Sequence, residues 1–147
     1  MAITQAIANS FKKELLDGDN DFSQSGGDVF NIALYTSSAT LTSAPTVYPG
    51  DSTGNQVSNS GQYTQGGGKL VNGGTSMTAG VARCDFADRS FTGVTLTARG
   101  ALIYNTSFSN KAVAVLNFGS DKTATSGTFT IQFPAATSTA AILRISG

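Results

Sequence analysis

The chain contains 147 residues, with nine Lys and Arg against nine Asp and Glu and no His. Its zero net charge offers no field that attracts phosphate backbones or anionic lipid, which argues against nucleic acid or a membrane as partner. The lack of His removes the commonest general base and metal ligand, so we expect no enzyme activity, metal or cofactor. The length suits one domain over residues 1–147, and the absence of a recognisable leader predicts a soluble chain.

The first predicted element is an amphipathic helix over residues 3–16. Apolar side chains recur there at every fourth position: Ile3, Ile7, Phe11 and Leu15. This spacing places them on one face of a helix, and Gly18 just beyond it is a suitable C-cap. Because the stripe lies at the end of the chain, we expect the helix to be a docking or oligomerisation element as well as part of the core.

A strand and then a long polar segment follow the helix. Residues 29–36 alternate in the manner of a first strand. Residues 37–68 are built from Ser, Thr, Gly, Asn, Gln and Pro, and such a segment buries too little apolar surface to offset its ordering entropy. We therefore expect a loop that is mobile in the free domain and becomes ordered against a partner. The expected anchors are its apolar side chains Leu41, Val47, Tyr48 and Tyr63.

The rest of the chain has the pattern of successive short strands. The candidates are residues 69–71, 76–77, 81–88, 90–98, 101–104, 112–116, 127–134 and 140–146, with turns at 119–122 and 125–127. With the strand at 29–36, and with the two short candidates at 69–71 and 76–77 counted as at most one, about seven or eight strands at short spacing predict a mainly β fold. The expected architecture is an antiparallel β-sandwich, jelly-roll-like, with a barrel as the other possibility.

Four aspartates form the sharpest local pattern, because Asp17, Asp19, Asp21 and Asp28 have the spacing of a calcium loop. However, Phe22 occupies the position where that loop needs Gly, and a strand follows where a second helix belongs. An acidic turn after the helix is the favoured interpretation. We therefore predict that neither calcium nor a chelator changes the melting temperature.

Other residues that could carry chemistry also have simpler interpretations. Cys84 is the only cysteine and falls on the apolar face of a predicted strand, which predicts a buried structural thiol. Asp85 and Asp88 lie at a strand end where turn-forming Asp is common. The Gly-rich run at 65–70 lacks the residues of a phosphate loop and predicts a bend into a strand. Residues 105–107 match a glycosylation acceptor but are expected to form only a turn.

Several segments resemble a family of small structural proteins from the virion gene clusters of tailed bacteriophages, notably phages of aquatic bacteria. These segments are AITQAIANSFKKELL, GDVFNIALYTSSATL, YTQGGGKLVNGG, TARGALIYN, NKAVAVLNFG and FTIQFP. The similarity extends from Ala2 to about Ile145. It implies a virion protein that is made in the bacterial cytoplasm and assembles with other virion proteins, either the major capsid protein or tail proteins, and with copies of itself. It implies no catalytic residue.

Within a virion we expect a capsid decoration or cement protein that binds the head lattice through the long loop and the helix. A tail, neck or baseplate component is the first alternative. A carbohydrate-binding module for receptor recognition is the second. Such modules commonly present an aromatic face to the sugar, and because the chain has no Trp, Tyr48 and Tyr63 would have to supply it.

Overall fold

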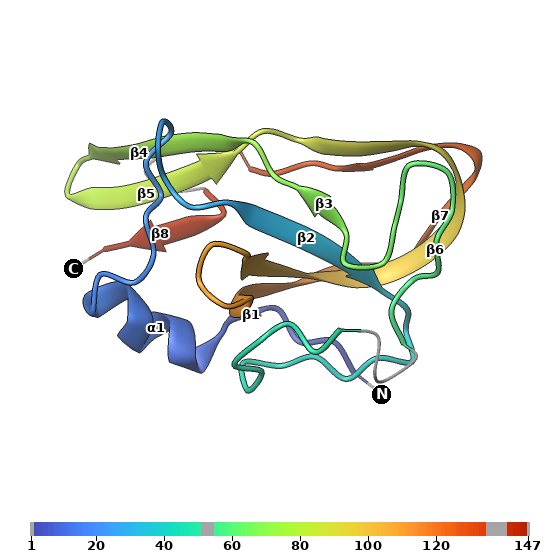
Figure 1. The fold of residues 1–147 in the computed structure, drawn as a ribbon, viewed down its shortest axis with the longest axis horizontal. Helices are drawn as coiled ribbons and strands as arrows, with labels where there is room; N and C mark the ends of the chain where they lie inside the picture. Colours follow the sequence, from blue (N-terminus) through green and yellow to red (C-terminus); the bar gives the residue numbers. More distant parts are fainter. Residues whose placement is uncertain (1, 51–54, 135–140, 147) are drawn as a thin grey trace.

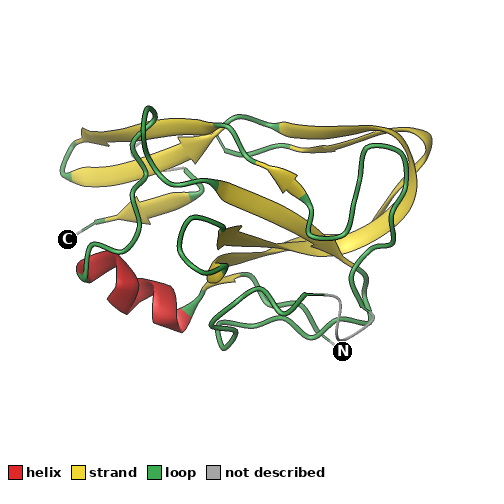
Figure 2. Cartoon of the chain, in the orientation of Figure 1, coloured by secondary structure: helices red, strands yellow, loops and turns green. Residues whose placement is uncertain are grey.

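The computed structural model of the chain describes residues 2–50, 55–134 and 141–146. This part is mainly β, with one short helix (Figure 1, Figure 2), which confirms that the fold is mainly β. The strands form one sheet of five and one of three, and all their pairings are antiparallel.

The larger sheet contains, in spatial order, β1 (Ala6–Ile7), β7 (Lys111–Ile131), β6 (Arg89–Asn105), β2 (Phe30–Tyr35) and β3 (Gly68–Lys69). The smaller sheet contains β4 (Asn72–Thr78), β5 (Val81–Phe86) and β8 (Leu143–Ile145). Figure 1 shows the smaller sheet at one end of the molecule. The expected first strand at 29–36 is confirmed as β2.

Strands β6 and β7 each join two segments that the sequence predicts as separate strands. The predicted turns at 119–122 and 125–127 were wrong, since both lie inside β7. Opposite the first, β6 advances two residues from Ala98 to Gly100 while β7 advances five from Asn117 to Lys122. The extra residues form a bulge, in which Gly119 has a φ of 82°. The hairpin curves strongly, as Figure 1 shows, so that Phe118 and Phe129 of one strand come within 6.1 Å.

The amino-terminal helix is shorter than predicted. Helix α1 spans Asn9–Leu16, and the residues before it pair with β7 instead, with Ala6 opposite Val115. The first half of the predicted helix is extended because the edge of β7 offers its backbone groups a partner. The predicted C-cap is confirmed, since Gly18 has a φ of 80° and donates its N–H to Leu15 O in the pattern of a Schellman motif.

Aromatic rings form the centre of the core where the two sheets and α1 meet. Phe30 of β2 and Phe86 of β5 lie with ring centroids 5.6 Å apart. Phe22 stacks on Phe30 at 4.5 Å and meets Phe11 of α1 edge-on at 6.0 Å. Phe22, which occupies the position where a calcium loop needs Gly, is therefore a core residue. Its ring connects the turn after α1 to both sheets.

Candidate interaction surface

The stripe predicted on the helix divides between the core and a partly exposed surface. Ile3 is buried beside Leu41, with which it forms a parallel bridge, and Phe11 is buried under α1. Ile7 and Leu15 remain partly exposed. The first two side chains are committed to packing within their own chain. A role in docking stays a prediction for Ile7 and Leu15.

The four anchors predicted in residues 37–68 divide in the same way. Leu41 and Tyr63 are buried at 4% and 0% exposure, whereas Val47 is 39% exposed and forms a bridge with Lys111. Tyr48 is partly buried and stacks on Tyr104 of β6, with ring centroids 4.4 Å apart. Because its ring is fully covered, Tyr63 cannot present a face to a sugar. For Val47 and Tyr48, the interaction role stays a prediction.

Hydrogen bonds around the buried Gln56 hold the segment against the larger sheet. Its side-chain amide donates to Tyr48 Oη at 2.7 Å, and its Oε1 accepts from Gly66 N–H at 2.6 Å and from Tyr63 Oη at 3.3 Å. Tyr63 Oη in turn accepts from Leu34 N–H at 2.8 Å. Described residues of this segment therefore pack on their own domain.

This packing corrects the expectation that residues 37–68 order only against a partner. The reasoning from composition assumed that few apolar residues mean little burial. Here, however, Leu41, Val57 and Tyr63 are each almost completely buried, and β2 supplies backbone partners for the segment. Residues 51–54 of the segment lie outside the described part of the chain.

The Gly-rich run confirms its predicted role as a bend into a strand. Gly67 has a φ of 85°, and a Cβ atom there would lie 1.7 Å from the carbonyl oxygen of Ile32. The backbone can approach β2 this closely only because no side chain intervenes. The close approach places Gly68 and Lys69 in register with Ile32 and Asn31 as strand β3.

The exposed apolar side chains of the smaller sheet form a row. Met77, Ala82 and Ile145 are direct cross-strand partners on β4, β5 and β8, so their side chains lie on one face. All three are exposed, Met77 at 73% and Ile145 at 60%. We call these three residues the apolar ledge.

The same face of the smaller sheet continues inward to a narrow apolar crevice. Two residues further along β5 and β8 are Cys84 and Leu143, both buried. With Phe11, Leu15 and residues of the ledge they line a crevice of about 150 Å³ between this sheet and α1. Helix α1 therefore covers the inner end of the face, and the ledge extends beyond it.

The predicted buried thiol is confirmed at the floor of this crevice. Cys84 is 5% exposed, and burial, aided by the charge of Asp85, raises the pKa of its thiol to about 12. A thiol with such a pKa is protonated at neutral pH and is a poor nucleophile. It serves as an apolar packing group.

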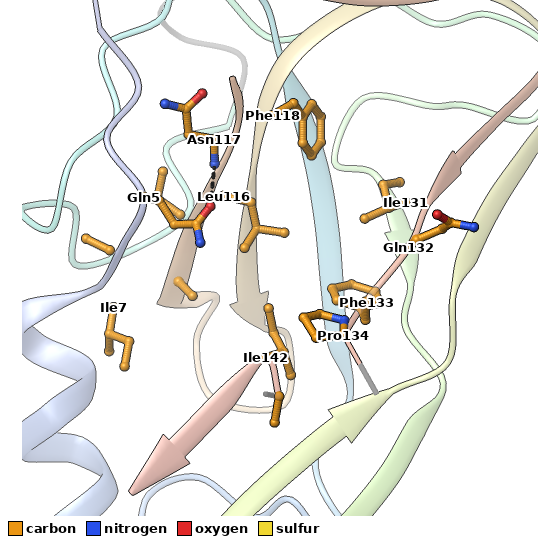
Figure 3. Close-up of a pocket in the computed structure, with 14 residues that line it drawn as sticks. Gln5, Ile7, Leu116, Asn117, Phe118, Ile131, Gln132, Phe133, Pro134 and Ile142 are labelled. Carbon is orange, nitrogen blue, oxygen red and sulfur yellow. Dashed lines mark hydrogen bonds between the residues drawn. The ribbon is translucent and has the colours of Figure 1, made fainter. Parts of the chain in front are cut away.

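A second hollow lies beside the edge of β7 (Figure 3). This groove of about 390 Å³ is flanked by β1, by β7 and by residues 131–134 and 141–142. Gln5 Oε1 accepts the backbone N–H of Asn117 at its rim, at 3.3 Å. All 14 residues drawn in Figure 3 lack an ionisable side chain. The groove offers shape and apolar contact without acid–base groups.

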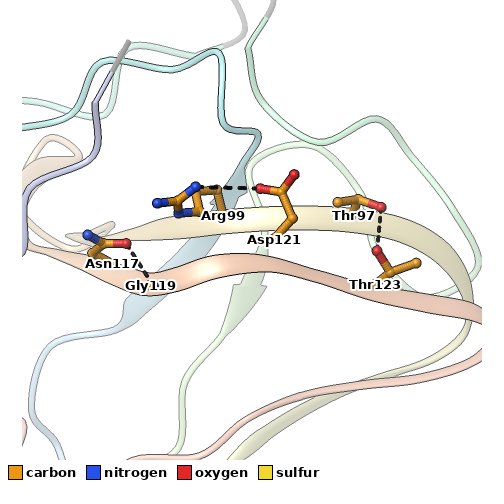
Figure 4. Close-up of polar contacts among 6 residues, drawn as sticks. All are labelled: Thr97, Arg99, Asn117, Gly119, Asp121 and Thr123. Atoms are coloured by element: carbon orange, nitrogen blue, oxygen red, sulfur yellow. Dashed lines mark hydrogen bonds and ion pairs between the residues drawn. The ribbon is translucent and has the colours of Figure 1, made fainter.

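The outer surface of the curved hairpin is polar (Figure 4). Thr97 and Thr123 face each other across β6 and β7 with hydroxyl oxygens 2.8 Å apart. At the bulge, Arg99 and Asp121 form a long ion pair of 3.9 Å, and both side chains are substantially exposed. Asn117 Oδ1 accepts the N–H of Gly119. These contacts stabilise the bulge and are too solvated to define a catalytic site.

The remaining candidate carboxylates bond to nearby backbone or amide groups. Asp85 Oδ1 accepts from Phe86 N–H and Asp88 Oδ1 from Phe133 N–H, each at 2.9 Å. Asp28 Oδ2 accepts from Asp21 N–H and from the side chain of Asn105. No group of three or more metal-ligating side chains occurs among the described residues.

The predicted turn at 105–107 is confirmed, and Asn105 is buried within it. Its exposure is 0%, and its amide donates to Asn20 Oδ1 at 2.9 Å as well as to Asp28. In the same acidic turn, hydrogen bonds that Asp21 accepts from the side chain and backbone of Ser23 lower the pKa of its carboxyl group. The acidic turn and the β6–β7 turn are thus joined by side-chain amides.

Reasoning from the sequence missed Gln56, Tyr104, Met77 and Ile145. Gln56 lies in a run of polar residues and carries no local signal of burial. Ile145 lies on a strand with apolar alternation, which is also the pattern of a covered face, and Met77 is the only large apolar side chain of β4, NGGTSMT. Only the position of α1 shows that the cover ends before the ledge.

Comparison with family models, with curated proteins and with solved structures finds no significant match to this chain. Within the described residues, no helix has the length and apolar character needed to cross a membrane. The function must therefore be argued from the chain's own surface and from the resemblance of its segments.

Proposed function

We propose that the chain is a structural protein of a tailed-phage virion that binds neighbouring virion proteins. The resemblance of its segments to small phage structural proteins supports this assignment. We further propose that it decorates the capsid as a cement protein on the head lattice. A place in the tail, neck or baseplate is the alternative within the same class.

We also propose that the two sheets act as the layers of a β-sandwich. The contact of Phe30 with Phe86 across the core supports this arrangement, as does the curvature that carries β6 and β7 around one end. In a sandwich the inner faces bury each other and leave the ends and edges for contact. The apolar ledge lies at such an end.

The ledge is the observation that carries the proposal. Met77 and Ile145 are large apolar side chains held in register on a rigid sheet, yet both are largely exposed. Covering such a side chain completely contributes about 1.5–3 kcal/mol relative to leaving it in water. Covering one of these side chains therefore changes the affinity of a lattice contact about tenfold or more, and the rest of the contact must offset the entropy cost of association.

The test is to delete the coding sequence from the phage and to supply the protein in trans. Particles that retain heads and tails but lose one protein, with bare or fragile heads in electron micrographs, are the expected result for a cement protein. Loss of tails or baseplates instead assigns the alternative location. Absence of the chain from purified wild-type particles, measured by mass spectrometry, refutes the proposal.

A matched pair of variants tests the ledge itself. Ile145→Ser removes an apolar ledge residue and should reduce the amount of protein in particles at least tenfold. Val71→Ser changes an equally exposed apolar residue, 65% exposed, outside the ledge, and should be incorporated normally. Equal incorporation of both variants removes the ledge from the argument.

A further inference from the structure

Strand β4 is an open edge of the smaller sheet. The order β4-β5-β8 leaves one side of β4 without a strand among the described residues, and Figure 1 shows it at the margin of the molecule. Gln24 approaches it at Gly74, where an added Cβ would lie 3.2 Å from Gln24 Cβ. The stretch beyond, Thr75–Thr78, is exposed at every position.

The hairpin geometry determines which backbone groups this edge presents. The turn between β4 and β5 is Ala79–Gly80, with φ angles of 53° and 75°, as a type I′ turn requires. In such a hairpin the flanking residues exchange hydrogen bonds, and bonding residues then alternate along the strand. Thr78 and Ser76 therefore bond to β5. Thr75 and Met77 direct their N–H and C=O groups outward.

Over Thr75–Thr78 the edge lacks the features that protect an edge strand, because the bulge of β4 lies before this stretch, between Asn72 and Gly74. The sequence of β4, NGGTSMT, contains no Lys, no other charge and no Pro. Proteins commonly place such residues on an open edge because its unpaired N–H and C=O groups pair readily with another strand. An edge that is bare over Thr75–Thr78 is suited to pairing with an extended backbone.

We propose that β4 pairs antiparallel with β4 of a second copy, around a twofold axis at Ser76. This inference deepens the proposed function, because it names a contact by which a virion protein associates with itself. Thr75 would exchange backbone bonds with Met77 of the second copy, and the reverse pair would do the same. The two small sheets become one continuous sheet.

The register follows from the extent of the open stretch. An axis at Ser76 uses both outward-facing residues of each copy. An axis at Thr75 would bring Met77 opposite Gly73 of the second copy, next to the position that Gln24 approaches. An axis at Met77 would bring Thr75 opposite the turn residue Ala79. Only the axis at Ser76 uses the whole stretch.

Charge does not oppose this pairing. The chain has zero formal net charge, and the nearest cation is Arg83, the β5 partner of Ser76, whose guanidinium donates to Thr78 Oγ1. Each guanidinium therefore lies at Thr78, and in this register the two Thr78 residues are four positions apart along the paired strands, about 14 Å. That distance exceeds the screening length of about 8 Å at physiological salt. A second copy can therefore approach without repulsion at the edge.

A charge swap at the axis tests the inference with the full chain. The twofold axis places the two Ser76 side chains directly opposite each other, so Ser76→Lys brings two lysines together and Ser76→Glu brings two glutamates together. Sedimentation velocity should show self-association weakened at least tenfold in either variant and restored when the two are mixed. Restoration on mixing is specific to a residue that faces its own copy. Failure of the mixture to associate more strongly than its components overturns the proposal.

Disulfide cross-linking gives a second readout that does not depend on those variants. Ser76→Cys should form a covalent dimer on mild oxidation, because Cα atoms of opposed non-bonded residues lie about 4.5 Å apart. Thr78→Cys is the matched control, since Thr78 would face Gly74 of the second copy. The buried Cys84 does not compete. Equal rates for the two variants contradict the edge pairing, while the Ile145 test of the proposed function is unaffected.

Discussion

Residues 37–68 and the apolar ledge show opposite relations between composition and burial. The first segment is polar, yet its apolar residues Leu41, Val57 and Tyr63 are almost completely covered. The ledge belongs to regular strands, yet Met77 and Ile145 are largely exposed. Composition alone would predict the reverse.

The difference lies in what stands opposite each region. The polar segment runs beside β2, β6 and β7, whose backbone and aromatic groups provide bonds and contacts for it. In the smaller sheet, α1 packs beside the buried Cys84 and Leu143, whereas Met77 and Ile145 on the same face are largely exposed. Burial depends on the neighbouring surface as much as on the segment itself.

The largest expected effect on stability comes from removing the ring of Tyr63, which packs residues 37–68 against the larger sheet. Tyr63→Ala deletes a fully buried aromatic side chain that packs edge-on against Phe91 at 5.1 Å. We expect a loss of about 3–5 kcal/mol in the free energy of unfolding, measured with denaturant. Tyr63→Phe keeps the ring and should cost about 1–3 kcal/mol, because Leu34 N–H loses its acceptor. If Tyr63→Ala unfolded at the same denaturant concentration as the wild type, the segment would not be packed on the domain through this ring.

A smaller loss of stability is expected when the side chain of the buried Gln56 is removed. Gln56→Ala leaves Tyr48 Oη and Gly66 N–H without their partner, at a cost of about 1–3 kcal/mol. Limited proteolysis should cut residues 55–68 faster in this variant than in the wild type. Gln65→Ala, in the same segment, is the control and should leave both measurements unchanged. Equal cleavage of wild type and Gln56→Ala would show that the segment is the mobile loop expected from its composition.

Alkaline titration sharpens the comparison on the side of the smaller sheet. Because the pKa of Cys84 is raised from 9.0 to about 12, the fold favours the neutral thiol. This contribution is fully present below about pH 9 and is lost as the pH rises toward 12. By pH 10 the loss of stability amounts to about 1 kcal/mol. The stability difference between wild type and Cys84→Ala should therefore shrink from pH 8 to pH 11; a constant difference would show that the thiol is not buried in solution.

The smallest effect is expected at the ledge. Ile145→Ser should change the free energy of unfolding by no more than about 0.5 kcal/mol, because the side chain is already exposed. Leu143→Ala, two residues away on the same face but buried, should cost about 2 kcal/mol or more. A large loss for Ile145→Ser in dilute protein would mean that the ledge is covered within a single chain.

Elements that depend on local pattern could be predicted from the sequence. Alternation located β2 and β5, and Gly18 ended the helix as expected. The turn predicted at 119–122 is wrong, because the backbone freedom of Gly119 serves a bulge inside β7. Whether a Gly bends a strand or ends it depends on the strand beside it, which a local pattern does not reveal.

Elements that depend on distant partners could not be predicted in this way. Ile3 and Ile7 fit a helical stripe, but the edge of β7 and the bridge to Leu41 hold them extended. Gln56 is buried where it bonds to Tyr48 and Tyr63, and Tyr104 from a distant strand stacks on Tyr48. The ledge is exposed because α1 packs at the inner end of the face, beside Cys84 and Leu143. Each outcome is set by a contact between residues far apart in the sequence.

The pairing of the chain's two ends with its middle has a consequence for the order of folding. Strands β6 and β7 are joined by the short turn at 106–110 and can pair as soon as both exist. By contrast, Ala6 pairs with Val115 and Phe30 pairs with Asn105. The early segments therefore leave the ribosome before these strand partners have been synthesised. Such non-local pairing is slow, since the intervening chain must close a long loop first. We therefore expect the β6–β7 hairpin to form before residues 6–7 and 30–35 pair with it.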